Sequence, residues 1–303
     1  MRLRTLVAIA LPATVCAAAL ASAPPRPRLA ATVRVGQGPC DATVAYGGVW
    51  IPVDGPGALV RIDPRRGRVT RTVRVGRTAC SVAAGFEALW VTRYRPSQLV
   101  RVDRRTGALQ RLELGKVPFD VVLTNSVWTT WFDDGGLTRV DPSTLRLLKR
   151  LAIGGSPAGL ALCWGRVWVG GGRRDTWLTT VDPVTNRFER VDVGVEAPSW
   201  PTCVGDALWS PTAHGVVRID PRSRTVVASI ALAGTPARVA AAPDGTIWIT
   251  DKEQNRIVRV DPATNTVVDE LAAGPGAFAV VRAAGSMWVT SYAGNDVRRY
   301  TPG

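Results

Sequence analysis

The sequence predicts an all-β fold built from seven copies of one unit of about 40 residues. Each copy carries a tryptophan inside a short apolar run, and a glycine and an aspartate recur in step with it. The seven tryptophans are Trp50, Trp90, Trp128, Trp168, Trp209, Trp248 and Trp288. A period near 40 residues with four short strands is typical of a propeller blade. We therefore expect a seven-bladed β-propeller of four-stranded blades over residues 31–303, as one domain.

The sixth unit illustrates how one blade is encoded. Its four strands are expected over residues 237–242, 246–251, 256–260 and 266–271. Because side chains alternate along a strand, Trp248 faces away from Ile247 and Ile249. Asp261 and Pro262 favour a type I turn into the outer strand. Neighbouring blades must cover both apolar faces, so the repeated tryptophans are expected in the core.

The N-terminal segment of the propeller is expected to close the ring. Residues 32–36 repeat residues 72–76 without a change, whereas the seventh unit lacks an outer strand of its own. Pairing of residues 31–35 with residues 296–301 would supply that strand and remove two exposed sheet edges.

Residues 1–21 are predicted to be a signal peptide. Arg2 and Arg4 form a basic start, and residues 5–20 are an uncharged stretch that is short for a membrane span. Ala19-Leu20-Ala21 is a small-x-small cleavage site, and residues 22–30 form a Pro/Arg-rich spacer. We expect an extracytoplasmic protein (secreted, periplasmic or at the cell surface) with no membrane span after cleavage. Retention of the segment as an uncleaved anchor is the alternative.

The four cysteines that remain after cleavage are expected to form disulfides. Their number is even, and an exported location permits oxidation. No CxxC motif is present, which argues against zinc or redox chemistry. Equivalent positions of adjacent inner strands can approach to the Cα separation of roughly 4.4–6.8 Å that a disulfide needs. The predicted pairs are Cys40–Cys80 and Cys163–Cys203, and four buried free thiols are the alternative.

The formal net charge of +14 suggests an anionic partner. Residues 22–150 carry 21 basic and 10 acidic side chains, whereas residues 151–303 carry 15 and 14. A polyanion is therefore expected on the first three blades, around the arginine-rich residues 65–77. Only three of the 38 basic residues are lysine, and such a bias also follows from the nucleotide composition of a genome. Dispersed arginines without a partner are the alternative.

Two segments resemble a known repeat. Leu89-Trp90-Val91-Thr92 with residues 99–103, and Ile247-Trp248-Ile249-Thr250 with residues 257–261, are similar to the YVTN-type propeller repeats of YncE-like proteins and of the related streptogramin B (virginiamycin B) lyases. The resemblance covers residues 31–303 and implies the fold. It leaves the activity open, because propellers host many functions.

The resemblance to the lyases implies histidines near the start of first strands and a glutamate at second-strand ends. The first positions are occupied here by Cys40, Cys80, Phe119, Ala158, Ser199, Ala237 and Phe278, and the second by Val53, Arg93, Trp131, Gly171, Thr212, Asp251 and Ser291. None is histidine, and Asp251 alone is acidic. Elimination needs a base close to the proton it removes, so we assign no catalytic residue. His214 lies in a shortened loop and is expected to serve hairpin geometry.

The loops between second and third strands carry aromatic residues among arginines. The candidate ligand-binding residues are Arg93, Tyr94, Arg95, Trp131, Arg173, Arg174, Trp177, Lys252 and Tyr292. Stacking and charge-assisted hydrogen bonds suit an anionic glycan or another polyanion. A solvated loop face whose aromatics pack on neighbouring loops is an equal alternative.

No cofactor or metal is expected, because histidine-cluster sites need more than one histidine. Asp133 and Asp134 precede two glycines and are as typical of a turn as of a calcium site. We therefore predict an exported, monomeric, non-catalytic binding or scaffolding propeller. The alternatives are a streptogramin B lyase-like or other enzyme on the same loop face, and the sensor half of a partner system.

Overall fold

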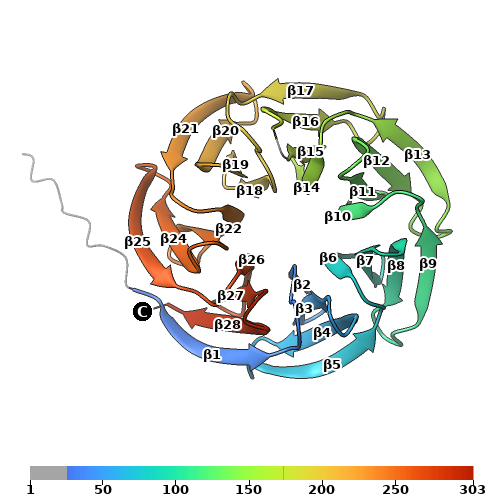
Figure 1. Ribbon diagram of the computed structural model, residues 1–303, viewed down its shortest axis with the longest axis horizontal. Helices are drawn as coiled ribbons and strands as arrows, with labels where there is room; N and C mark the ends of the chain where they lie inside the picture. Colours follow the sequence, from blue (N-terminus) through green and yellow to red (C-terminus); the bar gives the residue numbers. More distant parts are fainter. Residues whose placement is uncertain (1–25, 173, 303) are drawn as a thin grey trace, which may run out of the picture.

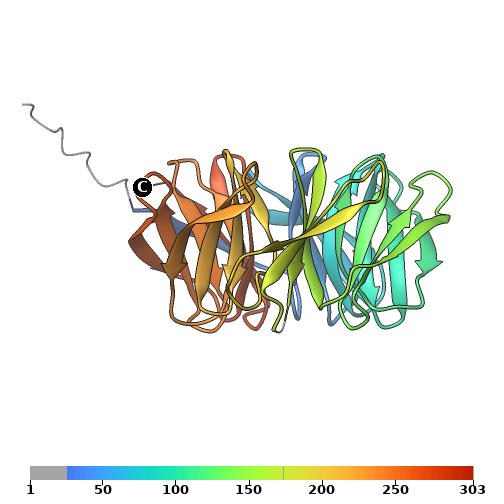
Figure 2. The same ribbon diagram turned by 90° about the horizontal axis from the view of Figure 1, so that it is seen from above.

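Seven four-stranded antiparallel sheets are arranged as a ring (Figure 1). The structure, a computed structural model, describes residues 26–172 and 174–302. The predicted seven-bladed β-propeller is thus confirmed. Figure 2 shows the ring as a thick disk with connecting loops on both faces. Among the residues that the structure describes, no helix is long and apolar enough to cross a membrane.

Each blade runs from an inner strand to an outer strand. The inner strands are β2 (Thr43–Ala45), β6 (Ala79–Gly85), β10 (Pro118–Leu123), β14 (Pro157–Cys163), β18 (Thr202–Val204), β22 (Pro236–Ala241) and β26 (Ala277–Ala283). The second strands are β3 (Gly48–Val53), β7 (Ala88–Tyr94), β11 (Val127–Trp131), β15 (Arg166–Gly171), β19 (Ala207–Thr212), β23 (Ile247–Asp251) and β27 (Ser286–Ser291). The third strands are β4 (Ala58–Asp63), β8 (Ser97–Asp103), β12 (Gly136–Val140), β16 (Trp177–Val181), β20 (Gly215–Asp220), β24 (Arg256–Asp261) and β28 (Asp296–Thr301). The outer strands are β5 (Arg68–Arg74), β9 (Leu109–Glu113), β13 (Leu147–Ala152), β17 (Phe188–Asp192), β21 (Thr225–Ala231), β25 (Thr266–Ala272) and β1 (Arg28–Arg34).

The ring closes through β1, the outer strand of the last blade. Val33 pairs with Val297 of β28, and the two strands lie side by side at the circumference (Figure 1). The strand begins at Arg28, three residues before the predicted start and inside the predicted spacer. Pairing with β28 extends to Thr301, so the last residues of the spacer gain strand partners as well.

The repeated tryptophans form the packing between blades, as predicted. Each of the seven is at most 2% exposed. Trp288 of the last blade, for example, lies in one apolar cluster with Ile51 and Val60 of the first blade. An aromatic side chain of this size buries about 150–250 Å². These residues therefore hold adjacent sheets together and are not candidates for ligand binding.

The repeated aspartate shapes the turn between the third and outer strands. Asp63 Oδ1 accepts hydrogen bonds from the backbone N–H groups of Arg65 and Arg66, at 2.8 and 3.0 Å. These bonds, with the Arg66 guanidinium, lower the pKa of Asp63 to about 2. Asp103 and Asp141 make the same pair of backbone hydrogen bonds. The repeated Asp is thus a turn residue.

Two disulfides join neighbouring blades. The structure contains Cys40–Cys80, with a Cα–Cα distance of 5.1 Å, and Cys163–Cys203, at 6.0 Å, which are the two pairs that the sequence predicts. Disulfides persist in oxidising compartments, so the bonds agree with an extracytoplasmic location. The predicted signal peptide, residues 1–21, lies outside the described residues.

Candidate functional site

A cavity of about 570 Å³ lies at the centre of the ring, on the face that carries the loops between second and third strands. Its walls include four aromatic side chains: Phe119 of β10, Phe132 after β11, Trp200 before β18 and Phe278 of β26. Phe119 lies 5.2 Å from Phe132 and 5.9 Å from Trp200, and Trp200 lies 5.2 Å from Phe278, between ring centroids. The volume is within the range of about 300–1,000 Å³ typical of small-molecule sites.

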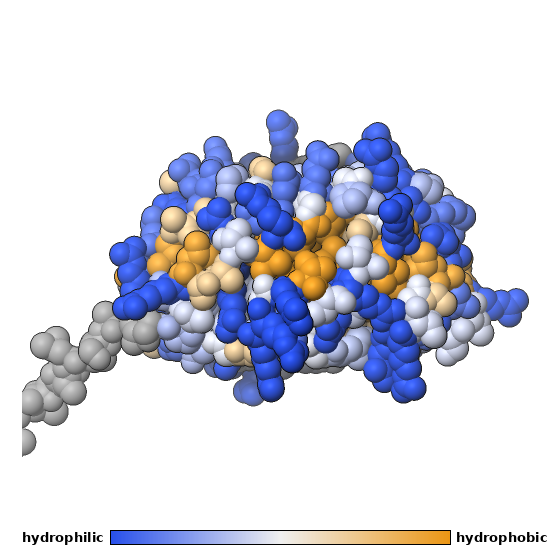
Figure 3. All heavy atoms as spheres, turned by 90° about the horizontal axis from the view of Figure 1, so that it is seen from below, coloured by the Kyte–Doolittle hydropathy of each residue, from blue (hydrophilic) through white to orange (hydrophobic). Residues whose placement is uncertain are grey.

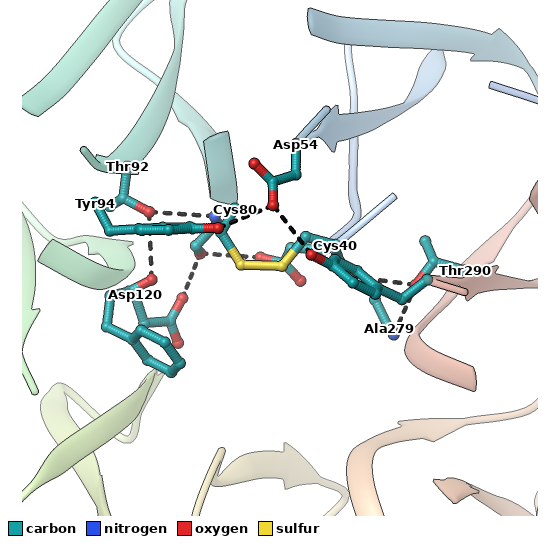
Figure 4. The surroundings of a disulfide bond; sticks show 12 residues. Cys40, Asp54, Cys80, Thr92, Tyr94, Asp120, Ala279 and Thr290 are labelled. Carbon is teal, nitrogen blue, oxygen red and sulfur yellow. Dashed lines mark hydrogen bonds between the residues drawn. A yellow bond between two sulfur atoms is a disulfide. The ribbon is translucent and has the colours of Figure 1, made fainter. Parts of the chain in front are cut away.

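Two tyrosines of the cavity rim bind one carboxylate. The O–H groups of Tyr94 and Tyr292 both donate to Asp54 Oδ2, at 2.9 and 3.0 Å. Figure 4 shows Tyr94 and Asp54 beside the Cys40–Cys80 disulfide, which also lines the cavity. Burial, and then the bond to Asp54, raises the pKa of Tyr94 to about 12 and raises the pKa of Tyr292 as well. Both phenols therefore stay protonated at neutral pH and tie three blades together.

Two cations lie at the mouth of the cavity. The side chains of Arg95 and Lys252 line it and are exposed to solvent. Neither forms an ion pair within residues 26–172 and 174–302. Asp133 lies on the same lining and is the one carboxylate among the described lining residues. An anionic group of a ligand would therefore find two cations available for charge-assisted hydrogen bonds.

A buried polar cluster lies behind the aromatic wall. The guanidinium of Arg238 lies 5.0 Å from the ring centroid of Trp200 and 5.4 Å from that of Phe278. Its nitrogens lie 3.4 Å from Asp41 Oδ1 and 3.7 Å from Asp120 Oδ2. The cation stacks against aromatic faces while it neutralises carboxylates of two other blades.

Ser81 connects the two carboxylates of this cluster. Its Oγ lies 2.9 Å from Asp41 Oδ2 and also within hydrogen-bond distance of Asp120 Oδ1. A hydroxyl has one proton to donate, so the second bond needs a proton from a carboxyl group. Burial raises the pKa of Asp120, the Arg238 guanidinium opposes the shift, and the Asp41 carboxylate adds to it. Asp120 thus holds a proton more readily than an exposed carboxyl group, in keeping with its bond to the Ser81 hydroxyl.

The structure brings together some of the predicted ligand-binding residues. Tyr94, Arg95, Lys252 and Tyr292 line the cavity. They come from the loops of the second, sixth and seventh blades, which are far apart in the sequence and meet at the centre of the ring. The predicted Arg173 lies outside the described residues.

Other predicted residues lie elsewhere. The guanidinium of Arg93 donates to the carbonyl oxygen of Arg77 and to Gln98, between strands rather than into the cavity. Trp131 is buried and donates its indole N–H to Thr138. Trp177 lies under the guanidinium of Arg190, at 4.4 Å. Arg174 is exposed and does not line the cavity.

The sequence analysis does not identify the four aromatic side chains of the cavity wall, although the sequence contains a signal for them. Phe119, Phe278 and the cysteines Cys40 and Cys80 occupy equivalent positions at the start of the innermost segments, and all four line the cavity. The resemblance to the lyases implies histidines at these positions, whereas the apolar side chains that are present there mark a cavity wall. Trp200 stands outside the repeated tryptophan position, which is a further sign of a separate role.

Of the residues that the sequence suggests for catalysis or metal binding, Asp133 lines the aromatic cavity, whereas His214, Asp134 and Asp251 do not. His214 is in the turn between β19 and β20, where its backbone N–H donates to Thr212 Oγ1 at 3.3 Å. Asp134 pairs with Lys116 at 2.9 Å. No cluster of three metal-ligating side chains occurs in the described part of the chain. Asp251 is fully buried and pairs with Arg256.

Comparison with known proteins places the fold. No protein-family model and no curated protein matches the sequence. A solved streptogramin B lyase has a TM-score of 0.80 at 16% identity, covering 90% of this chain and 97% of the lyase. A catalytically inactive virginiamycin B lyase from Staphylococcus aureus with quinupristin has a TM-score of 0.77 at 14% identity, covering 89% and 99%. Hydrazine synthase from Kuenenia stuttgartiensis has a TM-score of 0.75 at 13% identity, covering 88% and 96%. At these low identities, the TM-scores show a shared fold alone.

Proposed function

We propose that this protein is a non-catalytic binding module for an amphipathic anion. The aromatic body of the ligand occupies the cavity between Phe119, Trp200 and Phe278, and its acidic group lies between Arg95 and Lys252. One observation carries the proposal: an apolar cavity with aromatic walls opens beside two exposed cations that form no ion pair within the described residues. The two disulfides support a role outside the cytoplasm.

The chemistry of the cavity favours a ligand with separate apolar and charged ends. Burial of about 200 Å² of apolar ligand surface contributes about 5 kcal/mol before the cost of immobilisation. The cations at the mouth add charge-assisted hydrogen bonds and steer an anion toward it. A ligand that is charged throughout would lose its hydration against the phenylalanines, and an apolar ligand would leave the cations unused.

A fluorescent aromatic sulfonate, 1-anilinonaphthalene-8-sulfonate, tests the proposal. We expect saturable binding of one molecule per chain by calorimetry, with an affinity that falls as salt is added. Phe278→Ala should weaken binding about tenfold or more by removing one wall, and Arg95→Gln with Lys252→Gln should weaken it about tenfold and flatten the salt dependence.

Lys149→Gln is the matched control, because Lys149 is an exposed lysine on the outer strand β13. It should bind the sulfonate like the parent. Absence of saturable binding, or binding that is indifferent to the three cavity substitutions, would refute the proposed site. Thermal melting of each variant shows whether a loss of binding is a loss of fold.

A streptogramin B lyase-like activity is the second candidate, and the shared fold is the observation that favours it. Incubation with quinupristin, followed by mass spectrometry, tests it directly. We expect the ring of the antibiotic to stay closed, because the cavity lining that the structure describes holds no histidine. If the protein opens the ring of the antibiotic, and Asp133→Asn or His214→Ala abolishes this activity, the protein is an enzyme and the non-catalytic proposal is overturned.

A further inference from the structure

A second cavity of about 310 Å³ adjoins the aromatic cavity on the same loop face. Tyr292 lines both cavities, and its ring stands between them. The lining of the second cavity comes from segments that enter β2 and β6 and that follow β3 and β27. Gly38, at a φ of +74°, permits this arrangement, because a Cβ there would lie 3.2 Å from Cε2 of Tyr292.

The second cavity is polar where the first is apolar. Its side chains include Gln37, Arg77 and Asn295. Arg77 is exposed and forms no ion pair among the described residues. Asn295 Oδ1 accepts the backbone N–H of Gly38 at 3.1 Å, so its amide N–H groups remain as donors. The cavity thus offers guanidinium and amide donors.

Acceptors line the same cavity. Asp54 Oδ2 receives both tyrosine hydroxyls, whereas its Oδ1 receives no side-chain hydrogen bond from the described residues. The Gln37 side-chain carbonyl is a second acceptor. A hydroxyl group both donates and accepts hydrogen bonds. One carboxylate, two amides and one guanidinium therefore suit a ligand with several neighbouring hydroxyl groups. The Asp54 carboxylate would repel a phosphate or sulfate, and the Arg77 guanidinium would repel an ammonium group.

We propose that the two cavities together bind a glycoside. The sugar ring lies in the second cavity, its hydroxyls bonded to Gln37, Asp54 and Arg77, and its apolar face lies on the ring of Tyr292. The aromatic, anionic aglycone lies in the first cavity. This inference rests on the proposed function and names the ligand class for the same site.

A set of coumarin glycosides tests the inference. The probes are the β-glucoside, β-galactoside, β-xyloside and α-mannoside of 7-hydroxycoumarin-3-carboxylic acid, whose carboxylate supplies the anionic group, and 7-methoxycoumarin-3-carboxylic acid is the matched compound without a sugar. We expect at least one glycoside to bind about tenfold more tightly than the methoxycoumarin by calorimetry, which corresponds to the 1.4 kcal/mol of a tenfold change.

Gln37→Ala and Arg77→Ala should each remove most of that gain and leave the binding of 1-anilinonaphthalene-8-sulfonate within twofold. Arg74→Ala is the control for lost charge, because Arg74 is an exposed arginine of β5 that lines neither cavity. It should keep the full gain.

The outcomes separate the two proposals. If the sulfonate binds but no glycoside binds more tightly than the methoxycoumarin, the glycoside inference is overturned and the proposed function stands. A gain that survives both Gln37→Ala and Arg77→Ala places the sugar elsewhere and also overturns it. If neither the sulfonate nor any coumarin binds, both proposals fail.

Discussion

Arg238 of the sixth blade pairs with Asp120 of the third blade, with 3.7 Å between Nη1 and Oδ2. Blades of a propeller mainly contact their neighbours, whereas this pair joins blades that are not adjacent in the ring (Figure 1). Asp41 of the first blade, 3.4 Å from the same guanidinium, makes the contact a three-blade junction. Ion pairs directly behind the aromatic cavity thus join three blades at the centre of the ring.

Replacement of Arg238 by Met should destabilise the protein by about 3 kcal/mol. The change removes the cation from the buried carboxyl groups of Asp41 and Asp120, and an uncompensated buried charge is costly. Arg282→Met is the control, since Arg282 is exposed on β26, and it should change the free energy of unfolding by less than about 0.5 kcal/mol. Chemical denaturation measures the free energy of unfolding of the two variants. Equal denaturation midpoints would contradict a stabilising role of the Arg238 ion pairs.

Deletion of residues 29–36 should lower the melting temperature by about 10 °C or more. The deletion removes β1, exposes the edge of β28 and takes Val33 out of the apolar cluster with Ile62. Deletion of residues 1–25 removes none of these contacts and should melt like the parent. Calorimetric scans that coincide for the two deletions would show that β1 does not hold the ring closed.

Loss of the Cys40–Cys80 disulfide should affect both stability and binding. Cys40→Ser with Cys80→Ser should cost about 2–4 kcal/mol and weaken binding of the aromatic sulfonate, because this disulfide lines the cavity. Removal of Cys163–Cys203 should cost a similar amount and leave binding unchanged. Peptide mapping of exported protein without reductant provides the check, and four free thiols would refute the pairing.

Alkaline titration should show late ionisation of the tyrosines. The pKa values of Tyr46, Tyr94, Tyr292 and Tyr300 are all raised in the folded protein, with Tyr94 at about 12. Since a phenol in the unfolded chain ionises near its ordinary value of about 10, the folded state retains more protons above that pH. Stability should therefore fall as pH rises above 10.

The substitution Asp54→Asn tests the assignment of the late titration to the rim. It removes the negative charge beside Tyr94 and Tyr292, so their phenolate absorbance should develop at lower pH than in the parent, although burial still raises both pKa values. Glu87→Gln is the control, because Glu87 acts on Tyr46 alone among these tyrosines. A curve for Asp54→Asn that matches the parent would contradict the shared carboxylate.

The arginine-rich edge of the first blade should bind polyanions weakly. Figure 3 shows this edge of the disk, where hydrophilic side chains project around an apolar band. Arg68 and Arg74 are exposed on β5, and Arg71 donates to the carbonyl oxygen of Arg104. Changing all three β5 arginines to Gln should lower the salt at which the protein leaves heparin, because fewer counterions are released on binding.

The control for the heparin experiment removes three exposed arginines from other blades. These are Arg187, Arg222 and Arg282. The control should elute closer to the parent than the β5 variant does. Equal shifts in the two variants would mean that net charge alone governs retention and would contradict a localised patch.

The sequence by itself determined the architecture, because the signals for it are local and repeated. A tryptophan in an apolar strand and an aspartate that accepts two backbone N–H groups act within one unit or between adjacent units. Even ring closure could be predicted, since residues 32–36 repeat residues 72–76. The cysteine pairs followed from the same periodicity, because equivalent positions in adjacent blades lie at similar radii.

Only the tertiary structure decided the site. Phe119 and Phe278 line one cavity although they are far apart in sequence, because every inner strand converges on the same centre. Trp131 and Phe132 are adjacent, yet the first is buried in its sheet and the second faces the cavity, and the difference depends on where β11 ends. Arg238 reaches Asp41 and Asp120 only because the closed ring brings three blades within the length of one side chain. Periodicity specifies which residues are equivalent, whereas contacts across the ring depend on side chains that differ between the repeats.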